Sequence, residues 1–246
     1  MQNGAPRYFE KGLHDSRGLI VTGTHAKCGK TVAAAGLAGV LNSLGFKVQA
    51  IKPLSFLPEV SIRKGVEQHF FDRLIRPLQP VDLFSVESAD AVNTMEWQRM
   101  VEQCLRRVYP YLLEVPGSLA SPLRFVKGEA QDCVALAQQL EVPILLVTAK
   151  SPEIINDMAQ AFAYVRARQA PLIGWLAVET RAESLPCWQQ DLLYLHHHYP
   201  FPYLGELAYS PSISVEAQQQ GNLFRNTEIG LDLLPLQQAL DISIPF

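Results

Sequence analysis

Short apolar runs alternate along most of this chain with longer segments in which apolar and polar residues are mixed. Some runs, such as PILLVT at residues 143–148, are apolar throughout, which is typical of strands buried on both faces of a parallel sheet. The pattern predicts strands at residues 19–22, 48–51, 111–115, 143–148, 172–178 and 203–207. Helical patterns fall between several of them, at residues 30–43, 130–140, 152–168 and 186–199.

This alternation predicts an α/β fold with a doubly wound, mainly parallel sheet flanked by helices. Residues 1–17 are expected to form a polar N-terminal arm, and residues 18–246 a single α/β domain. Residues 57–92 fit the rhythm less well, because prolines interrupt a mixed apolar and polar stretch. We interpret this stretch as an excursion at the carboxyl edge of the sheet, where α/β proteins place their ligands.

Composition and charge mainly exclude classes of partner and of protein. The chain has 246 residues, of which 48% are hydrophobic, and a formal net charge of −3. Its basic residues form no long run, so neither nucleic acid nor an acidic membrane is expected as a partner. Its four cysteines are far apart and form no CxxC pair, which argues against a disulfide framework. Neither a signal-peptide core nor an apolar run of 18 residues occurs, so we expect a cytoplasmic protein.

The first predicted strand leads into the polar loop GTHAKCGKT, residues 23–31, and then into a helical pattern. This is the context of a phosphate-binding loop, although Thr24 occupies the first glycine slot of the usual motif. The alternative is an ordinary turn with a chance Gly-Lys-Thr. As a phosphate loop it would place Lys30 on the β- and γ-phosphates of ATP and Thr31 on Mg²⁺. Because backbone N–H groups would face the phosphates, the candidate nucleotide-binding residues are Ala26, Lys27, Cys28, Gly29, Lys30 and Thr31.

Other residues with charged side chains follow later strands and should lie at the same edge of the sheet. Lys52 follows the second strand and can meet a phosphoryl group or an anionic substrate; a solvated strand-end lysine is the alternative. Glu114 follows an apolar run, where a carboxylate is costly to bury unless it is paired or bound to metal. We therefore expect Glu114 and Thr31 to share Mg²⁺, and a merely structural Glu114 is the alternative. The candidate substrate-binding residues are Lys52, Ser55, Gly117 and Ser118.

Six motifs, in order, are similar to those of the dethiobiotin synthetase family of P-loop NTPases: VTGTHAKCGKT, KP at residues 52–53, LLEVPGSLASPL, LEVPILLV, GWLA and YLGELAYSP. The resemblance covers residues 18–210 and is weak between 57 and 92. It implies an ATP- and Mg²⁺-dependent carbon–nitrogen ligase of biotin synthesis. Such enzymes join CO₂ to 7,8-diaminononanoate, phosphorylate the resulting carbamate and close a cyclic urea. The resemblance also implies a homodimer, and Lys30 and Lys52 as the catalytic residues that compensate phosphoryl charge.

The chain departs from the family mainly at functional positions. His25 and Lys27 replace acidic or polar residues of the loop, and Pro116 removes a backbone donor from the segment after the glutamate. Val178 stands where the family has an asparagine that reads adenine. The family's metal-binding aspartate beyond the Lys-Pro pair has no clear counterpart, and Glu59 and Asp72 are the candidates to replace it.

These departures leave two other functions open. One is a non-catalytic paralogue that binds nucleotide or an anion and acts through a protein partner. The other is a different P-loop enzyme, such as an amide ligase or a partitioning ATPase. An acidic residue close to Glu114 and Thr31 would favour the ligase over the non-catalytic protein, because it would complete the metal site.

Overall fold

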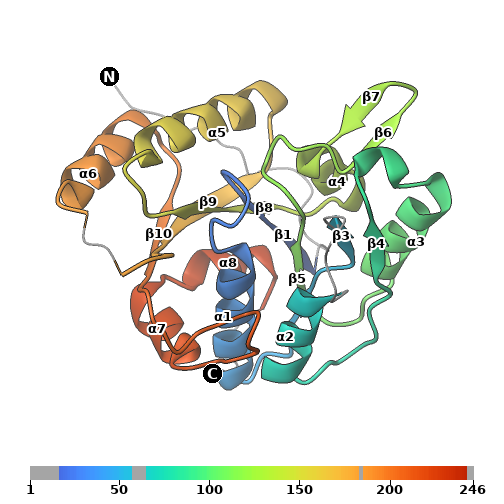
Figure 1. Cartoon of the computed structure of the whole chain (residues 1–246), viewed down its shortest axis with the longest axis horizontal. Coiled ribbons are helices and arrows are strands. Elements are labelled where there is room, and N and C mark those ends of the chain that lie inside the picture. Colours follow the sequence, from blue (N-terminus) through green and yellow to red (C-terminus); the bar gives the residue numbers. More distant parts are fainter. Residues whose placement is uncertain (1–16, 57–64, 183–184, 243–246) are drawn as a thin grey trace.

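The computed structural model describes residues 17–56, 65–182 and 185–242, and its strands alternate with helices (Figure 1). The strands are β1 (Gly18–Gly23), β2 (Gln49–Ile51), β3 (Leu54–Phe56), β4 (Phe84–Val86), β5 (Tyr111–Glu114), β6 (Arg124–Val126), β7 (Glu129–Gln131), β8 (Ile144–Ala149), β9 (Leu172–Val178) and β10 (Tyr203–Leu207). The helices are α1 (Lys30–Ser43), α2 (Val66–Leu74), the 3-10 turn η1 (Ala89–Ala91), α3 (Thr94–Leu105), α4 (Cys133–Leu140), α5 (Ile154–Arg168), α6 (Trp188–His198), α7 (Leu223–Gly230) and α8 (Leu234–Ala239).

Among the described residues, six strands form one parallel sheet in the order β10-β9-β8-β1-β5-β2. The first strand, β1, lies in the interior of the sheet. The next, β2, lies at one edge, and β5 then fills the position between them. The chain then continues on the other side of β1 through β8, β9 and β10. The winding therefore changes direction at β1, and the crevice at the carboxyl ends of β1 and β5 is where such sheets bind ligands. The predicted doubly wound α/β fold is confirmed.

Helices cover both faces of this sheet (Figure 1). Helices α1, α2, α7 and α8 contribute to one buried apolar cluster, and α3 to α6 to the other. Helix α1 is rich in alanine and glycine and is buried along most of its length, so its small side chains let it pack closely against both the sheet and α7. The loop before α1 is therefore carried by one of the most buried helices of the fold.

The predicted strands and helices agree with the structure to within a few residues, with one notable correction. The helix predicted at residues 130–140 begins only at Cys133. Asp132 caps it by accepting a hydrogen bond from the backbone N–H of Ala135 at 2.9 Å. Ala130 and Gln131 instead pair with β6 in an antiparallel hairpin, because the turn at Lys127 and Gly128 folds this segment back.

The stretch at 57–92 contains more regular structure than the sequence indicated. Residues 57–64 lie outside the described residues. Beyond them, α2 packs against α1 and β2, and β4 pairs in a separate parallel ladder with β3, which precedes the stretch. Helix α3 follows and was not predicted, although Asn93 and Glu96 form a capping box that is readable as a helix start.

Residues 1–16 of the predicted polar arm also lie outside the described residues, so the division into an arm and a single domain stays a prediction. Arg17 is described, and its carbonyl accepts a hydrogen bond from the backbone N–H of Tyr111 at 2.8 Å, which extends the contact between β1 and β5. Within the described part of the chain, no helix combines the length and apolar character that crossing a membrane requires.

Candidate nucleotide-binding site

The loop between β1 and α1 has the backbone shape of an anion cradle. Gly29 precedes the first residue of α1 and has a φ of 98°, in the left-handed region that favours glycine. A Cβ at this position would lie 2.6 Å from Cγ1 of Val178, so the loop could not approach β9 with a larger residue. Lys27 also has a positive φ, of 61°. The free N–H groups of the first turn of α1, which carries no acidic residue, suit an anion at this point.

Neighbouring strand β8 holds this loop in place. The backbone N–H of Thr24 donates to the carbonyl of Val147 at 3.0 Å, and the Cys28 thiol donates to the same carbonyl at 3.3 Å. Burial raises the pKa of the Cys28 thiol above its ordinary value, so the group stays neutral. Cys28 therefore anchors the loop with its side chain, and only its backbone is available to a ligand.

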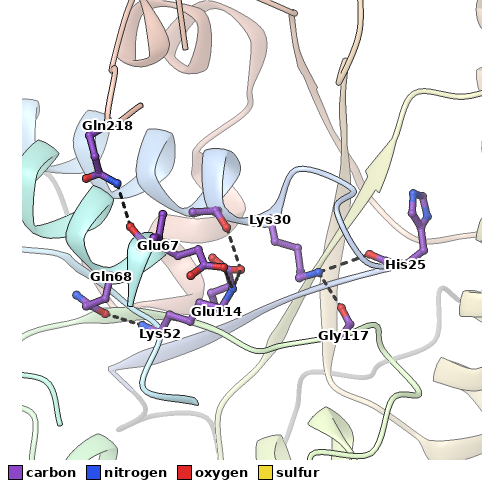
Figure 2. A network of polar contacts seen from close by, with 10 residues as sticks. His25, Lys30, Lys52, Glu67, Gln68, Glu114, Gly117 and Gln218 are labelled. Atoms are coloured by element: carbon purple, nitrogen blue, oxygen red, sulfur yellow. Dashed lines mark hydrogen bonds and ion pairs between the residues drawn. The ribbon is translucent and has the colours of Figure 1, made fainter. Parts of the chain in front are cut away.

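Lys30, the first residue of α1, is buried, and its side chain reaches the segment that follows β5. Its Nζ donates a hydrogen bond of 2.7 Å to the carbonyl oxygen of Gly117 and lies 3.5 Å from the carbonyl oxygen of His25 (Figure 2). Both partners are neutral carbonyl groups, so no carboxylate of the described residues accepts a hydrogen bond from Lys30. An anion in the loop would therefore meet an ammonium group that no carboxylate contacts directly.

Glu114 is the buried acid of the site. It ends β5 beside Val21 of β1, and its side chain is 1% exposed. Its Oε1 accepts hydrogen bonds from Thr31 Oγ1 at 3.0 Å and from Lys52 Nζ at 2.9 Å. Its Oε2 is buried and has no hydrogen-bond partner within the described structure. A buried carboxylate oxygen without a partner is costly, which indicates that it is placed to meet a further positive group.

Lys52, which follows β2, joins Glu114 to a second acid. Its Nζ lies 3.0 Å from Oε1 of Glu67, in the first turn of α2, and its backbone N–H donates to Gln68 Oε1 at 2.7 Å (Figure 2). Burial alone would lower the pKa of Lys52, but the attraction of Glu114 and then of Glu67 outweighs it and leaves the pKa raised. Burial likewise acts to raise the pKa of Glu67, and Lys52 reverses this and lowers it. Lys52 and Glu67 are therefore charged at neutral pH.

Sequence reasoning missed Glu67. Of the two acids proposed for the missing aspartate, Glu59 lies outside the described residues. Asp72 accepts a hydrogen bond from Gln68 Nε2, one turn back on α2, at 2.8 Å. The apolar positions at 66, 70 and 71 have helical spacing and would have placed Glu67 in the first turn of a helix. Its position beside Lys52 depends on how α2 packs on β2, which the pattern does not reveal.

A cavity of about 650 Å³ opens above the loop and these acids. Of the residues predicted for the site, most line it: Ala26, Lys27, Gly29, Lys30, Thr31, Lys52, Ser55, Glu114 and Gly117. The cavity lining does not include Cys28 or Ser118. The backbone N–H of Ser118, expected to meet substrate, donates instead to Ser121 Oγ at 2.9 Å.

The ends of β9 and β10 and the loop that follows β10 form another wall of the cavity. Val178 is buried against Gly29 and gives this wall an apolar surface where the asparagine was expected. Glu179 accepts hydrogen bonds from Lys150 Nζ at 2.7 Å and from the backbone N–H of Tyr209 at 3.1 Å. Burial acts to raise the pKa of Glu179, but these bonds, led by the one from Lys150, lower it. Hydrogen bonds of Glu179 therefore hold the ends of these strands together.

The residues present fit Mg²⁺. Thr31, Glu67 and Glu114 offer the hydroxyl and carboxylate oxygens that this ion prefers, and Mg²⁺ needs few protein ligands because it keeps waters and phosphate oxygens. The unpartnered Oε2 of Glu114 is the atom that such an ion would satisfy. No group of three or more His, Cys, Asp or Glu side chains that could hold a metal by themselves occurs in the described ranges, so an ion here would need phosphate oxygens as well.

Known proteins resemble this chain over most of its length. A family model described as "AAA domain" matches residues 17–217. The ATP-dependent dethiobiotin synthetase of Nitrosospira multiformis is 26% identical over 87% of this chain and 97% of its own length. That of Cellvibrio japonicus is 25% identical over 91% of this chain and 99% of its own.

Solved structures share the fold at lower identity. MinD in the MinC:MinD cell division complex of Aquifex aeolicus matches with a TM-score of 0.53 and 15% identity, over 93% of this chain and 97% of that one. A ParA family ATPase from Chlorobium tepidum matches with a TM-score of 0.51 and 12% identity, over 92% and 96%. The chain therefore belongs to the AAA domain family of P-loop NTPases, as a divergent relative of the dethiobiotin synthetases.

Proposed function

We propose that the protein binds ATP with Mg²⁺ and uses it as a dethiobiotin synthetase-type carbon–nitrogen ligase acting on 7,8-diaminononanoate and CO₂. The observation that carries the proposal is that Lys52 forms ion pairs with both Glu67 and Glu114 beside the phosphate loop. The family's metal-binding aspartate has no counterpart in the sequence, and Glu67 supplies an acid in its place. This favours the ligase over a non-catalytic relative.

The charges of the site support this chemistry. Lys30 and Lys52 carry two positive charges and Glu67 and Glu114 two negative ones, so the buried cluster itself is close to neutral. Lys27, exposed at the tip of the loop, adds a positive charge. Bound Mg²⁺ would supply further positive charge to the phosphates. Such a site favours a polyanion and transfers phosphoryl groups mainly by positioning and charge compensation.

In the proposed reaction, an amine of the substrate first carries CO₂ as a carbamate. A carbamate oxygen attacks the γ-phosphorus of ATP, the bond to the β–γ bridging oxygen breaks and ADP leaves. The second amine then attacks the carbonyl carbon, phosphate leaves, and the amine proton passes to solvent. Lys30 would stabilise charge on the transferred phosphoryl group, and Lys52 would orient the carbamate. Ser55 and Gly117 lie at the cavity wall where the substrate would rest.

Calorimetry followed by a turnover assay tests the proposal. ATP should bind more tightly with Mg²⁺ than in EDTA, and ADP should form only when 7,8-diaminononanoate and bicarbonate are both present. The matched variant is Glu114→Gln, which keeps the size of the side chain and removes its charge; it should lose the Mg²⁺ effect. ADP formation independent of the diamine would refute the proposed substrate.

Two observations favour the second candidate, a relative that binds nucleotide without turnover and acts through a protein partner. Val178 gives the cavity an apolar wall in place of an amide, and Pro116 removes a backbone donor beside Gly117. Mg²⁺-dependent ATP binding with no ADP formation under any substrate condition would favour this candidate.

We also propose that the protein is a homodimer, as the sequence resemblance implies, and that it is cytoplasmic. Sedimentation equilibrium of the full chain measures the mass in solution, and the expected value is twice the monomer mass of 27.4 kDa. A monomer at all concentrations would contradict the dimer while leaving nucleotide binding to be measured separately.

A further inference from the structure

One side chain joins the loop after β10, which lines the cavity, to α2, the helix that carries Glu67. Gln218 lies in the loop between β10 and α7, and its Nε2 donates to the carbonyl oxygen of Val66 at 3.1 Å (Figure 2). The same Nε2 donates to the carbonyl of Val215 in its own loop at 2.7 Å. Two segments that are 152 residues apart are thereby tied by one amide group.

The loop holds Gln218 in an uncommon conformation for this contact. Its φ is 57°, in the left-handed region, which costs a residue other than glycine free energy. Backbone hydrogen bonds between Ser214 and Gln219, of 2.9 and 2.8 Å, close a tight turn around it. The N–H of Ala217 donates to Ser214 Oγ at 3.0 Å and braces the turn further. The turn thus presents the Gln218 amide to α2.

The two tied segments face the same cavity. Residues 213–216 line it from the side of the loop, and Glu67 lines it from the side of α2. Val66 is the first residue of α2 and the immediate neighbour of Glu67, and the residue before it, Gly65, provides no side-chain cap. The contact from Gln218 therefore restrains the end of α2 at which Glu67 is placed.

We propose that Gln218 is a positioning residue that sets the carboxylate of Glu67 for Mg²⁺ when nucleotide fills the cavity. A nucleotide that packs against residues 213–216 stabilises the turn, the turn holds Val66, and Glu67 stays within reach of Lys52 and Glu114. Gln218 itself touches neither phosphate nor metal. The inference rests on the proposed function only in requiring Mg²⁺-assisted nucleotide binding.

The test compares the affinity of a non-hydrolysable ATP analogue in Mg²⁺ and in EDTA. The dissociation constant in EDTA divided by that in Mg²⁺ measures how much Mg²⁺ tightens binding. In Gln218→Gly this ratio should fall by about three- to tenfold, the range expected when the hydrogen bond that restrains Val66 is lost, while the affinity in EDTA changes little. Glycine removes the amide and also relieves the left-handed strain, so a loss cannot be attributed to a more strained turn.

Two controls separate positioning from general damage. Gln219→Ala changes an exposed neighbour whose contacts with Ser214 are made by backbone atoms, and it should leave both affinities unchanged. Gln218→Asn tolerates the left-handed backbone but has a shorter amide, and it should behave like the glycine variant. An unchanged Mg²⁺ ratio in Gln218→Gly would overturn the inference, as would an equal loss of affinity in Mg²⁺ and EDTA. An unaltered chain with no Mg²⁺ effect would instead refute the proposed function itself.

Discussion

The Nζ of Lys52 lies 2.9 Å from Oε1 of Glu114, although 62 residues separate them, and both side chains are more than nine-tenths buried. An ion pair this deep is expensive to form, because both groups give up hydration. Thr31 and Glu67 offset the cost by adding a hydrogen bond and a second ion pair. The fold thus maintains a charged cluster beside the phosphate loop.

Glu67 should matter to the metal and less to the nucleotide alone. We expect Glu67→Gln to weaken ATP binding in Mg²⁺ by roughly tenfold and to leave binding in EDTA almost unchanged, because a charged ligand becomes neutral at constant size. Calorimetry in the two buffers measures this. The control is Asp72→Asn on the same helix, whose carboxylate is occupied by Gln68. Equal loss in both variants would contradict a specific role for Glu67.

The two lysines of the loop should differ sharply. Lys30 is buried and donates to the Gly117 carbonyl, whereas Lys27 is exposed. We expect Lys30→Ala to reduce ATP affinity by roughly tenfold or more, since a charge-assisted hydrogen bond in a buried site is lost. Lys27→Ala should cost less, and its effect should shrink as salt is raised, because an exposed charge is screened. A salt titration of both variants provides the measurement.

Val178 should relax the choice of base. An apolar wall cannot distinguish the hydrogen-bonding edges of adenine and guanine, so we expect ATP and GTP to bind with similar affinity. Introducing an amide by Val178→Asn should favour ATP by about tenfold, and Val178→Ala, which lacks one, should not. Competition binding with the two nucleotides tests this. A strong preference for ATP in the unaltered chain would show that another group reads the base.

The ion pair of Glu67 should make stability depend on acid. Lys52 lowers the pKa of this carboxyl in the folded protein, below the ordinary 4.5. Its contribution to the free energy of unfolding is therefore fully present above pH 4.5 and is lost as pH falls through the folded pKa. We expect the thermal midpoint of the unaltered chain to fall more steeply below this pH than that of Glu67→Gln. If the thermal midpoints of the two proteins fell equally steeply with pH in this range, the contribution of the Glu67 ion pair to stability would be refuted.

Away from the site, Asp132 should be important for stability alone. It is buried, caps α4 and accepts hydrogen bonds from Tyr164 Oη and, at 2.8 Å, from Arg168 Nη1. Asp132→Ala should lower the free energy of unfolding by about 2–3 kcal/mol, because a cap is lost and Tyr164 is left without its acceptor. Tyr164→Phe should cost less, since Asp132 keeps its other partners. Urea unfolding measures both, with nucleotide affinity expected to stay unchanged.

Local patterns in the sequence determined the main sheet, the helix after the loop and the chemical type of most cavity residues. Apolar runs specify buried strands, and Gly29-Lys30-Thr31 after the first strand predicts an anion site, because both signals arise from neighbouring residues. Glu114 could be singled out for the same reason, since a carboxylate at the end of an apolar strand is rarely without a partner. The resemblance to a family extended this reading to ATP and Mg²⁺.

Only the tertiary structure decided which acid joins Lys52 and what closes the cavity. Glu67 was missed because its position depends on how α2 packs against α1 and β2, and no local pattern encodes that packing. The contact of Gln218 with Val66 likewise joins segments 152 residues apart, through a left-handed turn that the sequence does not announce. Backbone periodicity reports which residues face a core, but contacts between distant segments form only when those cores are packed together.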